Sequence, residues 1–264
     1  MFDVSLFKQQ LNTSWLGQEL LHFEELPSTN SYAKKLESSS GLHGSVILTD
    51  FQTSGRGQYN RIWKTEPGQN LTFSLVLEPK ENNRFIVLTL ACALAIAEVC
   101  EQETKSKFDL KWPNDVVQNG QKICGLLTEA VYNGNEVDRV VIGIGLNVNQ
   151  EKFQEELSQT ATSLYKFTEK DSSREALLAR IFSKLEYYYR LWEVGELELI
   201  KRINKKLIGY GHWAQLTVDG NMLEGEFKFL GVNETGALLV LNKELEVNTF
   251  SYEQVRVHFD PQKS

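Results

Sequence analysis

Two arginines and two glycines stand close together in the segment 53–63, which reads TSGRGQYNRIW. Arg56 and Arg61 carry planar, permanently charged guanidinium groups that suit phosphate or carboxylate oxygens. Gly55 and Gly57 would let the backbone approach such an anion closely. The segment therefore predicts an anion-binding loop, although a solvated, flexible loop between two strands could have the same composition.

Residues that could attack a substrate or hold a metal are not arranged for either task. The three cysteines, Cys92, Cys100 and Cys124, form no CxxC pair, and the four histidines show no metal-ligand spacing. No cysteine or serine stands in a recognisable nucleophile motif. The sequence therefore predicts no metal-ligating residues and no disulfide framework, and it favours a site that binds and polarises anions.

The segment 140–149, VVIGIGLNVN, alternates as a strand does. Its apolar residues share one face, while Gly143, Gly145, Asn147 and Asn149 share the other. A face of two glycines and two amides lets a ligand approach the backbone and hydrogen-bond to side chains. We interpret this face as a ligand floor, against the alternative of a solvent-facing edge strand with glycine bulges.

Three shorter features could contribute to a site but could equally be ordinary structural features. KWPND, at 111–115, is a strand-terminating turn in the simpler interpretation, because its proline biases the preceding residue toward an extended conformation. Lys122 would begin the next strand, where a lysine is usually solvated. In PSTN, Ser28, Thr29 or Asn30 could each cap a helix, and a helix cap can also hold a polar or anionic ligand.

Apolar periodicity predicts the elements that would position these residues. Strands are predicted at 20–26, 45–50, 71–79, 108–115 (running into a turn), 122–132 and 139–149. Helices are predicted after the Ser-Thr-Asn cluster, at 85–103, from a capping box of Ser172 and Glu175 through Leu191, and at 197–207.

The character of the sequence changes near 209–211. Residues 212–250 carry short strands separated by turns, which is the pattern of a small β-barrel. We therefore predict two domains, 1–209 and 210–264.

The bulk composition excludes several classes of protein. The 264 residues carry a formal net charge of -7, which argues against a general nucleic-acid binder. The most apolar segment, 85–100, is interrupted by Thr89 and Glu98 and falls short of the ~20 residues of a membrane span, so it is predicted to be a buried helix. Residues 1–20 lack the pattern of a signal peptide. We expect a cytoplasmic protein that binds neither nucleic acid nor membrane.

In order and at this spacing, these motifs resemble those of the biotin–protein ligases. Five segments carry the resemblance: STN at 28–30, Gln52 with GRGQYNRIW at 52–63, KWPND at 111–115, KICGLL at 122–127 and GIGLNVN at 143–149. The barrel-like end fits as well, since that family carries a small C-terminal β-barrel. Each motif alone is weak, but five in sequence order are specific.

The resemblance implies an α+β catalytic domain, with a mixed β-sheet flanked by helices as in class II aminoacyl-tRNA synthetases and biotin–lipoate ligases, followed by a Src-homology-3-like barrel. It implies that ATP and biotin are substrates, with Mg²⁺ accompanying the nucleotide. The carboxylate of biotin would attack the α-phosphate, pyrophosphate would leave, and the biotinyl-adenylate would acylate a lysine of a biotin carboxyl carrier domain. That domain would belong to a biotin-dependent carboxylase such as acetyl-CoA carboxylase. The enzyme would be a monomer or a homodimer.

By matching position, the resemblance implies roles for individual residues. The catalytic residues would be Lys122, Arg56 and Asp115, with Lys122 on carboxylate or α-phosphate oxygens and Asp115 holding the basic groups in place. Biotin would be bound by Ser28, Thr29, Asn30, Gln52, Gly55, Arg56, Gly57, Gln58, Lys122 and Gly125. ATP or the adenylate would be bound by Arg56, Arg61, Trp63, Lys111, Asn114, Lys122, Asn147 and Asn149. Trp63 and Trp112 could equally be ordinary core residues.

The sequence departs from the family pattern, which usually reads Gly-Arg-Gly-Arg-x-Gly-Arg, where this loop reads GRGQYNR. Gln58 replaces the second arginine. A charge-assisted hydrogen bond contributes ~1.5–3 kcal/mol against ~0.5–1.5 for a neutral one, so we predict an adenylate held about tenfold more loosely. Asn60 replaces the third glycine, and asparagine enters left-handed conformations at modest cost. Cys124, where alanine or glycine is usual, is small enough to be neutral.

Two rival functions remain open. Lipoate–protein ligases and octanoyl transferases share the fold and a lysine near this strand, but the GRGQYNRIW loop, the KWPND turn and the barrel favour biotin. The other rival is a catalytically silent biotin-binding regulator. Some biotin–protein ligases repress transcription through an N-terminal helix-turn-helix domain, and the roughly twenty residues before the first strand are too few for one.

Overall fold

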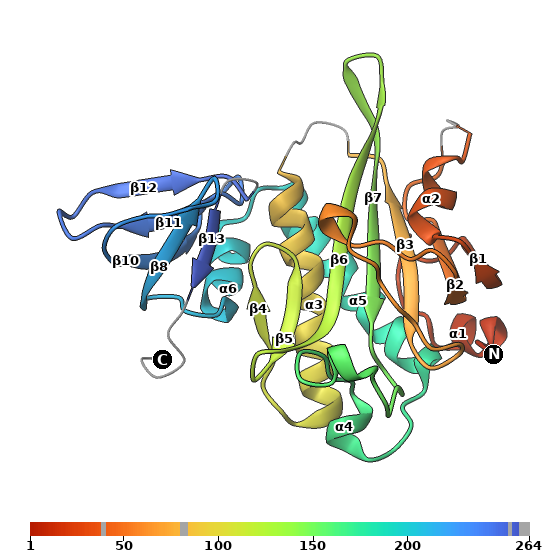
Figure 1. Ribbon diagram of the computed structural model, residues 1–264. Coiled ribbons are helices and arrows are strands. Elements are labelled where there is room, and N and C mark those ends of the chain that lie inside the picture. The colour runs from red at the N-terminus through yellow and green to blue at the C-terminus, as the bar shows by residue number, and fades with distance from the viewer. Residues whose placement is uncertain (38–40, 80–83, 253–254, 259–264) are drawn as a thin grey trace.

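The computed structural model describes residues 1–37, 41–79, 84–252 and 255–258. Its larger part is a seven-stranded sheet with the strand order β1-β2-β3-β7-β6-β5-β4 (Figure 1). Only β1 and β2 run parallel to each other, and every other neighbouring pair is antiparallel. The sheet is therefore mixed, as predicted. Its strands are β1 (Leu20–Leu26), β2 (Val46–Gln52), β3 (Leu71–Leu77), β4 (Asp109–Lys111), β5 (Asp115–Gln118), β6 (Gln121–Asn133) and β7 (Glu136–Leu146).

Helices cover both faces of this sheet. The long helices α3 and α5 pack against each other behind it, and α2 lies on the opposite face against β2, β3 and β7 (Figure 1). Two short 3-10 turns, η1 (Gln58–Asn60) and η2 (Glu155–Leu157), lie in loops. The α-helices are α1 (Val4–Gln10), α2 (Thr29–Lys34), α3 (Phe85–Thr104), α4 (Tyr165–Thr168), α5 (Arg174–Glu193) and α6 (Leu197–Lys206).

The main core lies between the sheet and the helices α3 and α5. All seven residues of β3 are buried, because this central strand is covered on both faces. Helix α3 is long and apolar enough to cross a membrane by length and composition alone, but 72% of its most apolar window is buried inside the protein. It is the buried helix that the sequence predicts. Cys124, on β6, is fully buried in this same core.

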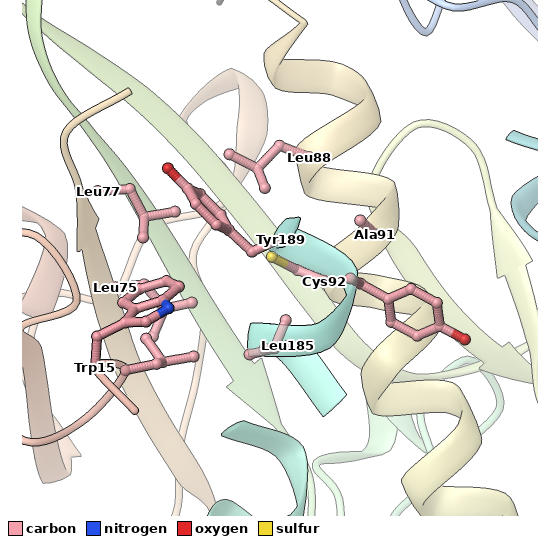
Figure 2. A pocket seen from close by; sticks show the side chains of 10 residues that line it. Trp15, Leu75, Leu77, Leu88, Ala91, Cys92, Leu185 and Tyr189 are labelled. Atoms are coloured by element: carbon pink, nitrogen blue, oxygen red, sulfur yellow. The ribbon is translucent and has the colours of Figure 1, made fainter. Parts of the chain in front are cut away.

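A small apolar void remains in this core, between β3, α3 and α5 (Figure 2). Its volume is about 10 Å³, close to the least that holds one water molecule. Trp15, Cys92 and Tyr189 are among the side chains that line it. The void is too small and too apolar to bind a substrate.

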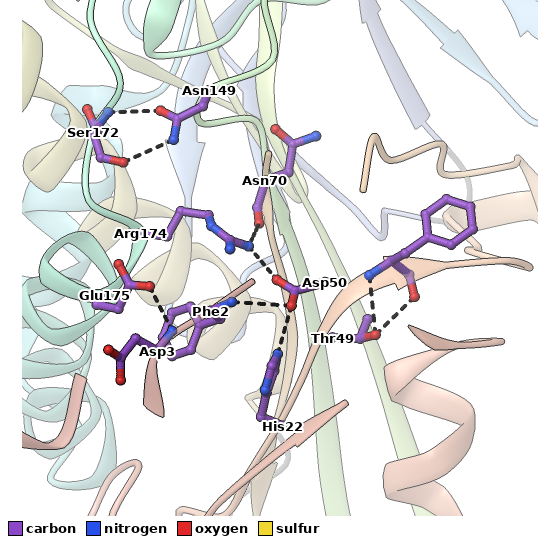
Figure 3. Close-up of polar contacts among 11 residues, drawn as sticks. Phe2, Asp3, His22, Thr49, Asp50, Asn70, Asn149, Ser172, Arg174 and Glu175 are labelled. Atoms are coloured by element: carbon purple, nitrogen blue, oxygen red, sulfur yellow. Dashed lines mark hydrogen bonds and ion pairs between the residues drawn. The ribbon is translucent and has the colours of Figure 1, made fainter. Parts of the chain in front are cut away.

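The start of α5 differs slightly from the prediction. Its N-cap is Ser173, whose hydroxyl accepts a hydrogen bond from the Ala176 amide at 3.2 Å, and not Ser172. Ser172 is instead held by Asn149, which donates to its carbonyl oxygen at 3.0 Å and accepts from its amide at 2.9 Å (Figure 3). The side chain of Asn149 thus fixes the segment before α5.

A buried ionic cluster centred on Asp50 joins distant parts of the chain (Figure 3). Arg174, at the start of α5, lies 2.7 Å from Asp50 Oδ1, and His22 Nε2 lies 3.0 Å from Oδ2. The Phe2 amide donates to the same carboxylate at 3.2 Å. Burial alone would raise the pKa of Asp50, but its bonds to Arg174 lower it below the ordinary value. The cluster holds α1, β1, β2 and α5 together.

The C-terminal part forms a separate antiparallel sheet with the order β12-β11-β10-β8-β13, and β9 pairs with β8. It curves as a half-barrel of the Src-homology-3 kind that the sequence predicts (Figure 1). The predicted boundary at 209–211 falls between α6 and β8 and stays a prediction. The strands are β8 (Trp213–Val218), β9 (Asn221–Met222), β10 (Phe227–Val232), β11 (Leu238–Leu241), β12 (Val247–Phe250) and β13 (Val255–His258).

Candidate active site

The two glycines of β7 form a floor on the sheet face that carries α2. A Cβ atom on Gly145 would lie 2.3 Å from the indole of Trp63, and one on Gly143 would lie 2.3 Å from the amide oxygen of Asn30. Gly125 on β6 is the direct partner of Gly145 in the sheet. These positions must be glycine, because other side chains rest directly on the strand backbone. In this structure Trp63 and Asn30 lie on the floor.

The floor ends sooner than the sequence predicts, because β7 ends at Leu146. Asn147 is 5% exposed and donates through Nδ2 to the Thr162 carbonyl at 3.0 Å. Asn149 does not continue the glycine face, since both its polar atoms bind the backbone of Ser172. The Asn149 side chain is therefore turned toward Ser172. Contacts of Asn147 and Asn149 with ATP or the adenylate stay predictions.

A buried polar cluster lies beside the floor, where α2 begins. Ser28 is the N-cap, accepting from the Ser31 amide at 3.3 Å. The backbone amide and the hydroxyl of Thr29 both donate to Gln52 Oε1, at 2.8 and 3.2 Å. All three side chains are less than 9% exposed, so the sequence-predicted biotin residues of β2 and α2 do meet.

Two members of this cluster were missed from the sequence. Ser74 Oγ lies 2.7 Å from Thr29 Oγ1 and 2.6 Å from Asn30 Oδ1. Glu129 accepts from Asn30 Nδ2 at 2.8 Å and pairs with Lys34 at 2.5 Å. The alternation of β3 gives a signal for Ser74, since it stands on the face opposite the apolar one.

Glu129 is an anion in this setting. Burial would raise its pKa, but the hydrogen bonds from Lys34 and Asn30 lower the pKa below the ordinary value. The carboxylate therefore fixes the orientation of the Asn30 amide: Nδ2 points to Glu129 and Oδ1 points to Ser74.

The arginine loop is a closed turn and not an open coil. The Trp63 amide donates to the Gly55 carbonyl at 2.9 Å, and the Gly57 amide donates to the Arg61 carbonyl at 2.7 Å. A Cβ atom on Gly55 would lie 2.4 Å from the Trp63 carbonyl oxygen, so this crossing requires glycine. At the tip, Tyr59 occupies the left-handed region with φ 54°. The sequence led us to expect that conformation at Asn60.

Arg56 ties this loop to α2. Its Nη2 donates to the Ser31 hydroxyl at 2.9 Å, although the side chain is exposed. Arg61 is exposed on the opposite arm of the turn. The loop thus spans the floor with one guanidinium beside α2 and a second one available to an anion.

Lys122 reaches the same floor from β6. Its Nζ lies 2.6 Å from Asp115 Oδ1 and 5.6 Å from the centre of the Trp63 ring. That carboxylate oxygen is buried and has no hydrogen-bond partner among the described residues, so its contact with Lys122 is an ion pair. Asp115 therefore holds the ammonium group, as the resemblance implies. A Cβ atom on Gly125 would lie 2.8 Å from Nζ, so a larger residue there would displace the lysine.

The backbone of Lys122 is fixed as firmly as its side chain. Its amide donates to the Thr160 carbonyl at 2.8 Å, and its carbonyl accepts from the Thr162 amide at 2.9 Å. The loop that follows β7 therefore runs along the start of β6. Together with β5, this pairing gives Lys122 little freedom to leave the floor.

The remaining KWPND residues point in different directions. Asn114 Nδ2 donates to the Leu126 carbonyl at 2.5 Å and its own carbonyl accepts from the Leu126 amide at 3.0 Å, which locks the turn onto β6. Lys111 is exposed. Trp112 Nε1 donates to the Gly236 carbonyl of the barrel at 3.2 Å. Trp112 is thus a domain contact, whereas Trp63 lies in the candidate site.

A polar cleft of about 510 Å³ lies next to this site, beyond the strand that carries Lys122. Gln118, Gln121, Thr162 and Lys166 are among the residues that line it. The residues that line it include neither the floor glycines nor Trp63. Within the described ranges, no three His, Cys, Asp or Glu residues are grouped to hold a metal ion.

Comparisons with known proteins identify the family to which the chain belongs. The sequence profile of the Biotin/lipoate A/B protein ligase family matches residues 22–147, which include every site segment up to Asn147. The bifunctional ligase/repressor BirA of Bacillus subtilis is 33% identical over 240 residues, covering 89% of this chain and 73% of that protein. Biotin–[acetyl-CoA-carboxylase] ligase of Mycobacterium tuberculosis is 27% identical over 73% of this chain and 72% of its own length.

The solved structures give the same result. Biotin protein ligase from Aquifex aeolicus, in complex with biotin and ATP, superposes with a TM-score of 0.77 at 31% identity, covering 91% of this chain and 99% of that one. The chain therefore belongs to the biotin/lipoate A/B protein ligase family, and the relatives it resembles along most of its length are biotin–protein ligases.

Proposed function

We propose that this chain is an ATP-dependent biotin–protein ligase that forms biotinyl-adenylate and transfers biotin to a lysine of a biotin carboxyl carrier domain. One observation carries the proposal. A buried polar cluster, a glycine floor, a clamped lysine and a two-arginine loop meet on one sheet face. These groups suit a molecule with a polar head, an apolar body and a carboxylate.

The polar cluster suits the ureido ring of biotin. That ring has a carbonyl acceptor and two N–H donors, and Thr29, Gln52 and Ser28 offer both hydrogen-bond types in a buried place. A buried group of this kind is costly unless its partners are satisfied, which favours a ligand with matching donors and acceptors. Lipoate has an apolar dithiolane in the corresponding position and would form no hydrogen bonds with these groups.

The carboxylate end would then reach Lys122 over the floor. Lys122 neutralises the attacking carboxylate and the α-phosphate, and Arg56 and Arg61 close over the phosphates from the loop. Asp115 keeps the Nζ of Lys122 in place without taking part in bond making. The carboxylate displaces pyrophosphate in line, so the enzyme needs only to position the two substrates and stabilise the developing charge.

Magnesium would enter with the nucleotide. Mg²⁺ usually keeps several waters and is held by phosphates with few protein ligands, which fits the lack of an acidic cluster among the described residues. Its contribution is charge neutralisation on the phosphates. Trp63, which covers the floor in this structure, would move aside or pack against the biotin body.

The transfer step can be tested with a carrier domain. We would incubate the enzyme with MgATP, biotin and a purified biotin carboxyl carrier domain, and measure the mass of the domain. The expected result is one added biotinyl group on the wild-type domain and none on a variant with the acceptor lysine changed to arginine. Modification of a lipoyl domain with lipoate instead would support the lipoate alternative, and no modification of either would support a silent binding protein.

A further inference from the structure

The tip of the arginine loop touches the C-terminal half-barrel. The guanidinium carbon of Arg256, on β13, lies 5.1 Å from the centre of the Tyr59 ring, within the range of a cation–π contact. Tyr59 is otherwise 58% exposed. A residue from the last described strand therefore contacts a loop that crosses the active site.

Arg256 is held ready for this contact. Its Nη1 donates to the Tyr252 carbonyl at 3.0 Å and to the Val255 carbonyl at 2.8 Å. These bonds fix the plane of the guanidinium before any ligand arrives. The backbone of Arg256 is also held, because it pairs with Thr217 of β8.

The half-barrel is itself seated firmly on the catalytic sheet. Trp112 of the KWPND turn donates to the Gly236 carbonyl at 3.2 Å. A Cβ atom on Gly236 would lie 2.6 Å from Ile86, at the start of α3. Figure 1 shows β13 on the side of the half-barrel that faces the large sheet. The position of Arg256 is therefore fixed relative to the large sheet.

The loop tip needs such support. Tyr59 has φ 54°, a left-handed conformation that a bulky residue adopts only when its surroundings favour it. At its other end the loop is tied to α2 by Arg56 and Ser31. The contact with Arg256 supplies the second tie, on the opposite side of the floor.

We propose that Arg256 latches the active-site loop closed through the ring of Tyr59, so that the C-terminal half-barrel controls how long the loop stays over the bound acyl-adenylate. Arg256 is a positioning residue and touches no substrate. Its effect on the adenylate rests on the proposed function, whereas its effect on loop opening does not. The two effects are therefore measured separately.

The first experiment uses the ligand-free protein. Trypsin cleaves after Arg56 and Arg61 when the loop opens, and the cleavage rate follows the open population when closing is fast. Arg256→Met should raise the rate about two- to fivefold, the range for an exposed cation–π contact. Lys243→Met, which removes the same charge from the exposed β11–β12 turn, should leave the rate unchanged.

A double-mutant comparison shows whether the ring of Tyr59 is the partner. Tyr59→Phe keeps the ring and should behave as wild type, whereas Arg256→Met should have no further effect in a Tyr59→Leu background. Equal cleavage rates for Arg256→Met and wild type would overturn the latch. The latch would also be overturned if Arg256→Met raised the cleavage rate equally in the Tyr59→Leu background, because Arg256 would then act through the half-barrel alone. Unfolding temperatures measured on the same variants identify that case.

The second experiment follows preformed biotinyl-adenylate. Arg256→Met should raise its dissociation rate by the same factor as the cleavage rate. A faster cleavage with an unchanged adenylate lifetime would overturn control of retention by the half-barrel. If no adenylate forms with any variant, the proposed function fails, while the cleavage experiment still decides on the latch.

Discussion

At the scale of single residues, the site depends on how a few charges are held. Among the described residues, Lys122 is the one cation that an ion pair holds at the glycine floor, and its partner is Asp115. Arg56 is held more loosely, by a single hydroxyl. The residue whose loss should remove most of the activating charge is therefore Lys122.

Lys122→Ala should reduce adenylate formation by at least a hundredfold, since one lost charge-stabilising group typically costs ~10²–10³ in rate. The fold should survive, because the Lys122–Asp115 pair is partly exposed, at 35% and 21%, and such pairs contribute ~1 kcal/mol or less. Biotin-dependent pyrophosphate release and the melting temperature measure the two effects. Lys201→Ala, at an exposed lysine of α6, is the control. Wild-type pyrophosphate release from Lys122→Ala would contradict the role.

Gln58→Arg should slow dissociation of the adenylate about tenfold, because a charge-assisted bond replaces a neutral one. The measurement is the release of preformed adenylate after dilution into excess unlabelled biotin and ATP. Gln10→Arg adds the same charge on exposed α1 and should change nothing. An off-rate equal to that of the wild type would show that this side chain does not face the adenylate.

At the scale of elements, the floor works because strand backbone is left bare. β6 and β7 place Gly125 and Gly145 side by side, and the loop after β2 lays Trp63 on them. The ligand thus meets a flat backbone surface and an indole cover. Any side chain on the floor would compete with both.

Gly145→Ala should destabilise the protein by about 1–3 kcal/mol, because its Cβ would lie 2.3 Å from the Trp63 indole. Biotin binding should weaken as well, since the added methyl group occupies the floor. Thermal unfolding and calorimetric titration with biotin give the two numbers. In a Trp63→Ala background the stability loss should shrink; an undiminished loss would mean that the clash lies elsewhere.

At the scale of the whole molecule, the Asp50 cluster joins elements that are far apart in the sequence. Arg174 and Asp50 are separated by 124 residues and are both nearly buried. Removing one partner of a buried pair leaves the other charge uncompensated. The cluster should therefore matter for stability and little for chemistry.

Asp50→Asn should lower the free energy of unfolding by roughly 3 kcal/mol at neutral pH, whereas Asp171→Asn, at an exposed position, should change it by less than ~0.5 kcal/mol. The folded-state pKa of Asp50 is lowered from its ordinary value of 3.8. Its stabilisation is thus present above that pH and is lost as the pH falls through the folded-state pKa. Below pH 4, the free energy of unfolding should fall more steeply with decreasing pH for the wild type than for Asp50→Asn.

The sequence predicted the elements of the site well and its fine geometry less well. Alternation alone identified the glycines of β7, because a strand face without side chains cannot pack a core and is suited to close contact with another group. Alternation also placed Asn149 on that face, because periodicity does not reveal where a strand ends or that the Asn149 amide binds the backbone of Ser172. Glu129 and the Arg256–Tyr59 contact were missed because they depend on tertiary packing between segments that no local pattern connects.

Acyl-adenylate formation in a single turnover tests the proposed biotin–protein ligase activity directly. The wild-type enzyme would be mixed with MgATP and with biotin, lipoate or octanoate in parallel, and the products identified by mass spectrometry. We expect an adenylate with biotin and none with the other two acids. An adenylate with lipoate or octanoate but not biotin, or no adenylate with any acid, would contradict the proposed activity.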